Sequence, residues 1–163
     1  KYEEALQIRR KLAEENPRTY LPDVAMTLNN LAILQQGKNE FSKALEKYEK
    51  ALQIRRKLAE ENPRTYLPDV AKTLNNLAVL QQDTNEFSQA LEKYEEALLI
   101  YRKLAAENPS RYEIVYAKLL IMGVTLFNKE KVDLTRAKTT LKKYNNVPYA
   151  DELLKIINEL EKE

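Results

Sequence analysis

The fold is decided by the stretch PDVAMTLNNLA at residues 22–32, which recurs with one change as PDVAKTLNNLA at residues 68–78. Its apolar residues return every three or four positions, which is the spacing of one face of an α-helix. These residues are Val24, Ala25, Leu28, Leu31 and Ala32. Pro22 suits the first turn of a helix, and the carboxylate of Asp23 suits its positive end. The stretch therefore predicts a helix from Pro22 to Gln36.

This stretch belongs to an internal repeat with a period of 46 residues. Residues 1–46 recur at 47–92 with six differences, so that 40 of the 46 positions are identical. The differences are Glu4/Lys50, Met26/Lys72, Ile33/Val79, Gly37/Asp83, Lys38/Thr84 and Lys43/Gln89. A third copy begins at Lys93 and diverges after Pro109. Because a fixed period of this kind is typical of stacked helical repeats, the sequence predicts an array.

Each repeat is expected to hold two helices. A turn at residues 37–39 follows the first helix, and Asn39 is expected to cap the second helix, which ends before Pro63. Residues 63–67 are expected to form a linker. The last part of the chain predicts three more helices, at Glu113–Phe127, Leu134–Tyr144 and Tyr149–Glu161. The final helix has one apolar stripe and a polar back, as expected of a cap.

We therefore expect an all-α fold, an α-solenoid of antiparallel helix pairs with a C-terminal capping helix. The expected single array comprises a half repeat (1–16), two repeats (22–62 and 68–108), a divergent repeat (113–144) and the capping helix (149–161). The half repeat carries only a second helix, which is the pattern of a fragment of a longer repeat protein. Its uncovered apolar face predicts self-association.

The composition excludes several classes of function. The chain has 27 Lys and Arg against 25 Asp and Glu, a net charge of +2, which argues against a basic nucleic-acid-binding surface. It has no Cys or His, which excludes thiol and imidazole catalysis and the usual zinc sites, and its two glycines cannot form a phosphate-binding loop. It shows no apolar run long enough to span a membrane and no signal-peptide pattern. We expect no enzyme activity, cofactor, metal, nucleic acid or membrane partner.

Paired helices with small residues at fixed positions resemble the tetratricopeptide repeat family. The family's small–aromatic–small pattern stands here as Ala44, Tyr48, Ala51 and as Ala90, Tyr94, Ala97, and its Leu-small pattern as Leu31-Ala32 and Leu77-Ala78. The stretch at residues 22–32 is similar to the longer-period subclass found in kinesin light chains, and this resemblance covers residues 1–109. Gln35 and Gln81 depart from the family by replacing an aromatic residue. The tyrosines at these positions, including Tyr2, are expected to pack in the core.

The resemblance implies a right-handed superhelix in which the first helices line an inner groove that binds a peptide. Residues spaced 3, 4 and 3 apart on these helices should face the groove. In the three copies they are Met26, Asn29, Ile33 and Gln36; Lys72, Asn75, Val79 and Gln82; and Lys118, Ile121, Thr125 and Asn128. Two of the six differences between the first copies, Met26/Lys72 and Ile33/Val79, fall in this set.

Asn30 and Asn76 complete the predicted peptide-binding residues, with two interpretations open. Asparagine is a poor helix former, so two consecutive asparagines in each repeat require a reason. One interpretation, implied by the resemblance, is a ladder of amides that binds the backbone of an extended peptide. The other is a set of hydrogen bonds between the helices of neighbouring repeats. The adjacent Asn29 and Asn75 are expected to be solvated.

The charged runs and the linker tyrosines carry less functional signal. Residues 9–11 and 55–57 read Arg-Arg-Lys and are followed one turn later by Glu-Glu, which predicts ordinary ion pairs on a solvated face. Tyr20 and Tyr66 lie in the expected linkers and are interpreted as edge-packing anchors.

These observations predict a non-catalytic protein–protein interaction module that binds a peptide or extended segment of an unidentified partner in the concave groove. The alternative is a structural scaffold or self-associating array that stacks through its N-terminal half repeat and has no peptide ligand. The resemblance favours a cytoplasmic location, while the residues themselves leave the compartment open. The near-identity of the first two copies fits a recent tandem duplication and an engineered consensus array equally.

Overall fold

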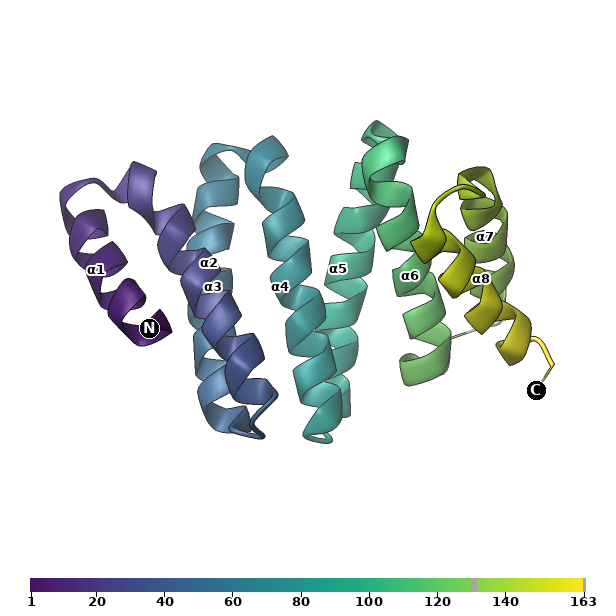
Figure 1. Ribbon diagram of the computed structural model, residues 1–163, viewed down its shortest axis with the longest axis horizontal. Coiled ribbons are helices and arrows are strands. Elements are labelled where there is room, and N and C mark those ends of the chain that lie inside the picture. Colours follow the sequence, from purple (N-terminus) through teal and green to yellow (C-terminus); the bar gives the residue numbers. More distant parts are fainter. Residues whose placement is uncertain (130–131, 163) are drawn as a thin grey trace. The chain divides into compact units, whose positions relative to one another are not determined.

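The computed structural model describes residues 1–129 and 132–162, which form eight α-helices and one 3₁₀ helix and contain no strand. The α-helices are α1 (Tyr2–Glu15), α2 (Pro17–Gln36), α3 (Phe41–Glu61), α4 (Pro63–Asp83), α5 (Phe87–Glu107), α6 (Pro109–Phe127), α7 (Val132–Leu141) and α8 (Pro148–Leu160); the 3₁₀ helix η1 is Lys142–Tyr144. Short connections join consecutive helices from α1 to α6 (Figure 1). The all-α repeat fold expected from the sequence is confirmed.

The chain divides into two compact units, Lys1–Ala97 and Leu98–Glu163. Unit 1 contains α1 to α4 and the first part of α5, and unit 2 contains the remainder. In unit 1, α1 packs on α2, α2 on α3 and α3 on α4, as expected of helix pairs stacked in sequence order. Within residues 1–129 and 132–162, we find no helix that combines the length and the apolar character needed to cross a membrane.

The first helix of each repeat begins earlier than the sequence predicted. Helix α2 starts at Pro17 instead of Pro22, and α4 starts at Pro63, so the expected linker at residues 63–67 is helical. The side-chain oxygen of Asn16 accepts a hydrogen bond from the backbone N–H of Thr19 at 3.3 Å, and Asn62 repeats this arrangement. This cap, followed by proline at the first helical position, starts the helix, and Pro22 is then accommodated inside it. Helix α6 likewise begins at Pro109 instead of Glu113.

The turns between paired helices also differ from the expectation. Asn39 does not cap α3: the N-cap residue is Glu40, which makes no capping side-chain hydrogen bond. Asn39 instead adopts a left-handed backbone conformation with φ of 59°, and the equivalent Asn85 has φ of 63°. Asparagine tolerates this region better than most residues because its short side chain can bond locally. The asparagines therefore make the tight reversal of the chain, and do not cap the next helix.

The core of unit 1 is built from small residues and one buried tyrosine. Ala25, Ala32, Ala44 and Ala51 are fully buried, which lets neighbouring helices approach closely. The side chain of Tyr48 is 1% exposed, and its hydroxyl donates to Gln36 Oε1 at 3.2 Å. Tyr94 is also buried, whereas Tyr2 is 49% exposed. The core position expected for all three tyrosines is therefore wrong for Tyr2, because no first helix covers it among the described residues.

The burial of Tyr48 predicts a loss of stability at high pH. Desolvation raises the pKa of its hydroxyl from 10.0 to about 12. The folded state favours the neutral hydroxyl. The contribution of this hydroxyl to the free energy of unfolding is therefore complete below pH 10 and is lost as the pH rises toward 12. A shift of this size corresponds to about 2–3 kcal/mol. The free energy of unfolding, measured by chemical denaturation between pH 8 and 12, should fall more steeply with pH for the wild type than for Tyr48→Phe. The same pH dependence in both proteins would show that Tyr48 is not the titrating group.

Unit 2 has its own core. Ala117, Leu120 and Ile121 of α6 pack with Leu134, Ala137 and Leu141 of α7 and with Ala150, Leu153 and Ile157 of α8. Helix α7 ends at Leu141 and η1 continues to Tyr144, where a single α-helix was expected to run to that residue. Burial alone would raise the pKa of Glu113, but hydrogen bonds from Lys143 and Tyr144 lower it below its usual value. These bonds connect η1 with α6.

Candidate functional site

The candidate site is the exposed surface shared by α2 and α4 in unit 1. Two hydrogen bonds hold these helices side by side: Asn76 Nδ2 donates to Asn29 Oδ1 at 3.3 Å, and Gln36 Nε2 donates to Asp83 Oδ2 at 3.0 Å. We call this surface the α2–α4 face and define it by Met26, Asn30, Ile33, Lys72, Asn75, Asn76, Val79 and Gln82. All eight belong to the peptide-binding residues predicted from the sequence.

Apolar groups and one lysine mark the α2–α4 face. Met26 is 42% and Ile33 is 48% exposed, which is high for large apolar side chains, and Val79 is half-buried. Lys72 is exposed and forms no ion pair with any residue that the structure describes. Asn30 is half-buried, and its side chain makes no hydrogen bond within residues 1–129 and 132–162. The face therefore offers apolar contact area, one positive charge and a free amide.

Asn29 was predicted to be solvated, and this is wrong: it is 1% exposed. Its Oδ1 accepts hydrogen bonds from Asn76 Nδ2 and from Arg55 Nη1, the latter at 3.4 Å. Successive residues of a helix are rotated by about 100°, so Asn29 lies about 60° away from Met26 around the axis of α2. That rotation is enough to turn Asn29 from the open face toward the next repeat.

Arg55 also contradicts the expectation of a solvated basic run, because it is only 5% exposed. Besides Asn29, its guanidinium donates to the hydroxyl of Thr73 and, at 3.2 Å, to the backbone carbonyl of Asp69. The Asp69 carboxylate lies 4.0 Å away. A buried charge requires such a set of partners. The buried side chains of Arg55, Asn29 and Thr73, with the partly exposed Asp69, therefore link α3 to α2 and α4.

Asn76 makes a hydrogen bond between repeats, as one of its two interpretations requires. Asn30 makes none, so the two equivalent residues differ in the structure. Two other amides of α4, Asn75 and Gln82, have buried side-chain oxygens that accept no hydrogen bond among the described residues.

The third copy has Tyr101 and Met122 at the positions of Arg55 and Asn76, and neither side chain supplies an amide or guanidinium donor.

The predicted residues of the third copy do not form an equivalent row. Ile121 was expected to face the groove, but it is buried in the core of unit 2. Lys118 is exposed and its Nζ lies 6.0 Å from the ring centroid of Tyr149. Thr125 is exposed, and Asn128 is the C-cap of α6 with a left-handed φ of 50°. Of the four predicted residues, Ile121 is therefore excluded by burial, whereas Lys118, Thr125 and Asn128 remain accessible.

Tyr20 and Tyr66 lie inside α2 and α4 instead of in linkers, and both are half-buried.

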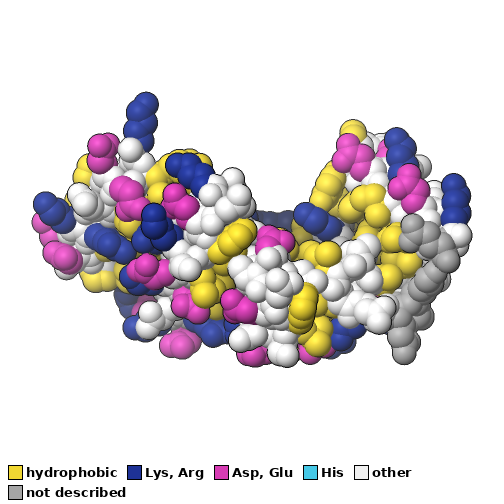
Figure 2. Space-filling model, turned by 90° about the horizontal axis from the view of Figure 1, so that it is seen from below, with side chains coloured by type: hydrophobic (Ala, Val, Ile, Leu, Met, Phe, Trp, Pro, Cys, Tyr) yellow, Lys and Arg dark blue, Asp and Glu magenta, His cyan; other side chains and the backbone are white. Residues whose placement is uncertain are grey.

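Lysine and arginine side chains alternate with acidic ones on the surface seen in Figure 2, so this view shows no extended basic patch. Among residues 1–129 and 132–162, no cluster of three or more acidic side chains is placed to hold a metal ion.

Helices α3 and α5 of unit 1 are joined by a pair of opposite charges. Arg56 of α3 bonds both carboxylate oxygens of Glu96 in α5, at 2.8 and 2.7 Å, beside a pocket of about 410 Å³ lined by side chains of both signs. In the preceding repeat the equivalent residues are Arg10 and Lys50, which cannot form this pair. The position of Glu96 is occupied by Glu4 in the first copy and by Lys50 in the second. The bridge between α3 and α5 therefore depends on the return of glutamate at this position in the third copy.

Replacing Glu96 by glutamine should lower the free energy of unfolding by up to about 1 kcal/mol, because a two-bonded ion pair at half-exposed positions is lost. The difference from wild type should shrink in 1 M NaCl, where the Debye length is about 3 Å. Urea denaturation at low and high salt checks this, with the exposed Glu107→Gln as the control on the same helix. A salt-independent loss would show that the charge of Glu96 is not the cause.

The comparisons with known proteins agree with this geometry. Residues 24–64 and 70–109 each match the family model of the tetratricopeptide repeat. These two segments of the chain are therefore similar to tetratricopeptide repeats. No curated protein matches the chain. Tetratricopeptide repeats generally mediate protein–protein interaction, and α2 and α4 lie largely within the matched segments.

Proposed function

We propose that the α2–α4 face binds an extended segment of a partner protein and that the chain catalyses no reaction. Two observations carry this proposal: Met26 and Ile33 are exposed and apolar on α2, and the amide oxygens of Asn75 and Gln82 on the hydrogen-bonded helix α4 are buried without a partner among the described residues. Apolar side chains supply contact area, and amide oxygens accept the backbone N–H groups of a peptide.

The spacing of the two amides fits an extended ligand. Asn75 and Gln82 are seven residues apart on one side of α4, which corresponds to about 10 Å along the helix axis. An extended chain rises about 3.3 Å per residue and covers this distance in about three residues. Rotation of the two amides would allow both to accept from one peptide, with Val79 between them providing an apolar contact.

The test uses a peptide selected against the purified chain from a display library. Ile33→Asp should weaken its binding by about tenfold or more, because the loss of one buried aliphatic side chain is worth about 1.5–3 kcal/mol. The matched control is Phe87→Asp, an equally exposed apolar residue on α5 outside the face. If only the control weakens binding, or neither variant does, the α2–α4 face is not the peptide site.

A second candidate function, self-association, is favoured by one observation on α1. Tyr2 and Ile8 are exposed on this helix, although the equivalent Tyr48 is buried. Light scattering over a concentration series should show growth of the wild type, and Ile8→Glu should abolish it. A constant monomer mass for the wild type would eliminate this candidate without affecting the peptide site.

A further inference from the structure

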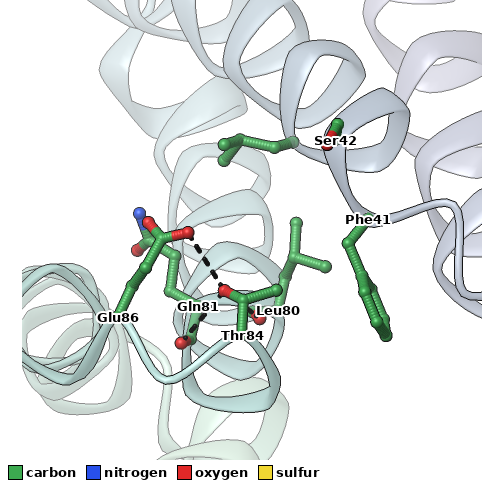
Figure 3. A pocket seen from close by; sticks show the side chains of 7 residues that line it. Phe41, Ser42, Leu80, Gln81, Thr84 and Glu86 are labelled. Carbon is green, nitrogen blue, oxygen red and sulfur yellow. Dashed lines mark hydrogen bonds between the residues drawn. The ribbon is translucent and has the colours of Figure 1, made fainter.

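A second candidate site lies at the edge of unit 1, away from the α2–α4 face. It is a pocket of about 70 Å³ between the first turn of α3 and the end of α4 with the turn that follows. Phe41, Leu45 and Leu80 line it with apolar surface, and Gln81, Thr84 and Glu86 line it with polar groups. Figure 3 shows the two kinds of side chain around the same space.

Gln81 supplies the first sign of a ligand. Its side chain is 6% exposed, and its Oε1 is buried without a hydrogen-bond donor among the described residues. Buried acceptors are nearly always paired in folded proteins, since leaving one unpaired is unfavourable. The polar side of the pocket therefore has room for a group that donates hydrogen bonds.

Glu86 supplies the second, independent sign. Its Oε1 accepts a hydrogen bond from the Thr84 hydroxyl at 3.1 Å, but it forms no ion pair with any residue in the described ranges. In the first repeat the equivalent carboxylate, Glu40, pairs with Lys43 at 3.2 Å. The second repeat has glutamine, Gln89, in place of that lysine.

The differences between the two repeats thus remove positive charge around Glu86. Two of the six, Lys38/Thr84 and Lys43/Gln89, each replace a lysine by a neutral residue. The carboxylate of Glu86 therefore lacks a cationic partner among the described residues. It lines the same pocket as Gln81, whose Oε1 is a buried acceptor, and as the apolar side chains. An ammonium group on an aliphatic stem matches all three features, because ammonium has only donors and the stem can lie on apolar surface.

We propose that this pocket binds the side-chain end of a lysine from a partner protein. The ammonium group donates to Glu86 and to Gln81 Oε1, and its methylene stem lies against Phe41 and Leu45. The available volume corresponds to about five water molecules at 10–15 Å³ each, which accommodates the ammonium and its neighbouring methylenes. The site shares no residue with the α2–α4 face, so its success or failure does not depend on the proposed peptide function.

The probe is n-butylammonium, the analogue of the lysine side chain, followed by NMR through the side-chain amide of Gln81 and the backbone amide of Thr84. Saturable shifts are expected with n-butylammonium, while n-butanol and butyrate should bind at least tenfold more weakly. Equal binding of n-butanol would overturn the proposal, since the pocket would then be an apolar cavity only. Tighter binding of butyrate would overturn it as well.

Three variants locate the effect. Glu86→Gln keeps the shape of the carboxylate and should weaken n-butylammonium binding about tenfold or more, whereas the control Glu92→Gln should not change it. Gln89→Lys restores the lysine of the first repeat and should abolish binding by occupying Glu86. Circular dichroism confirms that each variant is folded. Unchanged binding in both Glu86→Gln and Gln89→Lys would refute the assignment.

Discussion

Replacing Arg55 by alanine should lower the free energy of unfolding of unit 1 by about 3–5 kcal/mol, because it breaks a buried cluster around a charge. The guanidinium donates to Asn29 Oδ1, to the Thr73 hydroxyl and to the Asp69 carbonyl. The loss of Arg55 removes one hydrogen-bond donor from acceptors on α2 and α4, which keep the bonds from Asn76 and Thr73, and opens a cavity between three helices. Hydrogen exchange of the α2, α3 and α4 amides measures the effect within this unit.

The matched control is Arg9→Ala in the preceding repeat. Arg9 makes the same bonds to Thr27 and to the carbonyl of Asp23, but within the described part of the chain it has no partner equivalent to Asn29, and it is only half-buried. Its loss should cost about 1 kcal/mol, as for an ordinary hydrogen bond. Equal losses for the two variants would mean that the bond to Asn29, and the burial that accompanies it, contribute nothing to the stability of unit 1.

The fold could be predicted because its determinants are local in the sequence. The alternation of small and apolar residues around Leu31 and Tyr48 identifies the helices and their buried sides without knowledge of their neighbours. The start of α2 was misplaced because Pro17 and Pro22 suit a first turn equally well. The bond between Asn16 and the Thr19 amide decides between them, and a side-chain cap of this kind is a weaker signal than a proline.

The candidate site could be predicted only in part, because contacts with the next repeat decide which of its predicted residues are buried and which remain exposed. Met26 and Ile33 are exposed as expected, whereas Asn29, about 60° further around α2, is buried by its contacts with Asn76 and Arg55. A signal for the buried cluster was nevertheless present. In the third copy, the positions of Arg55, Thr73, Asn75 and Asn76 are occupied by Tyr101, Leu119, Ile121 and Met122. Polar residues that are replaced together by apolar ones are expected to contact one another.

The second large effect concerns Tyr48, whose replacement by alanine should cost about 3–5 kcal/mol. The ring is 1% exposed, and Ala44 and Ala51 on the same face of α3 carry only methyl groups, which cannot fill the space that the ring leaves. The variant also removes the donor to Gln36 Oε1, which then faces a cavity. Denaturant unfolding monitored by circular dichroism, together with hydrogen exchange in α2 and α3, measures the loss.

Tyr2→Ala provides the comparison, because the two tyrosines occupy the same position in successive repeats. Tyr2 is 49% exposed and no first helix covers it among the described residues, so its truncation should cost about 1 kcal/mol or less. The two variants thus compare the effect of the same substitution on the free energy of unfolding at a buried and at an exposed position. A large loss for Tyr2→Ala at micromolar concentration, absent on dilution, would indicate that a second copy covers α1. A large loss that does not depend on concentration would contradict the exposure of Tyr2.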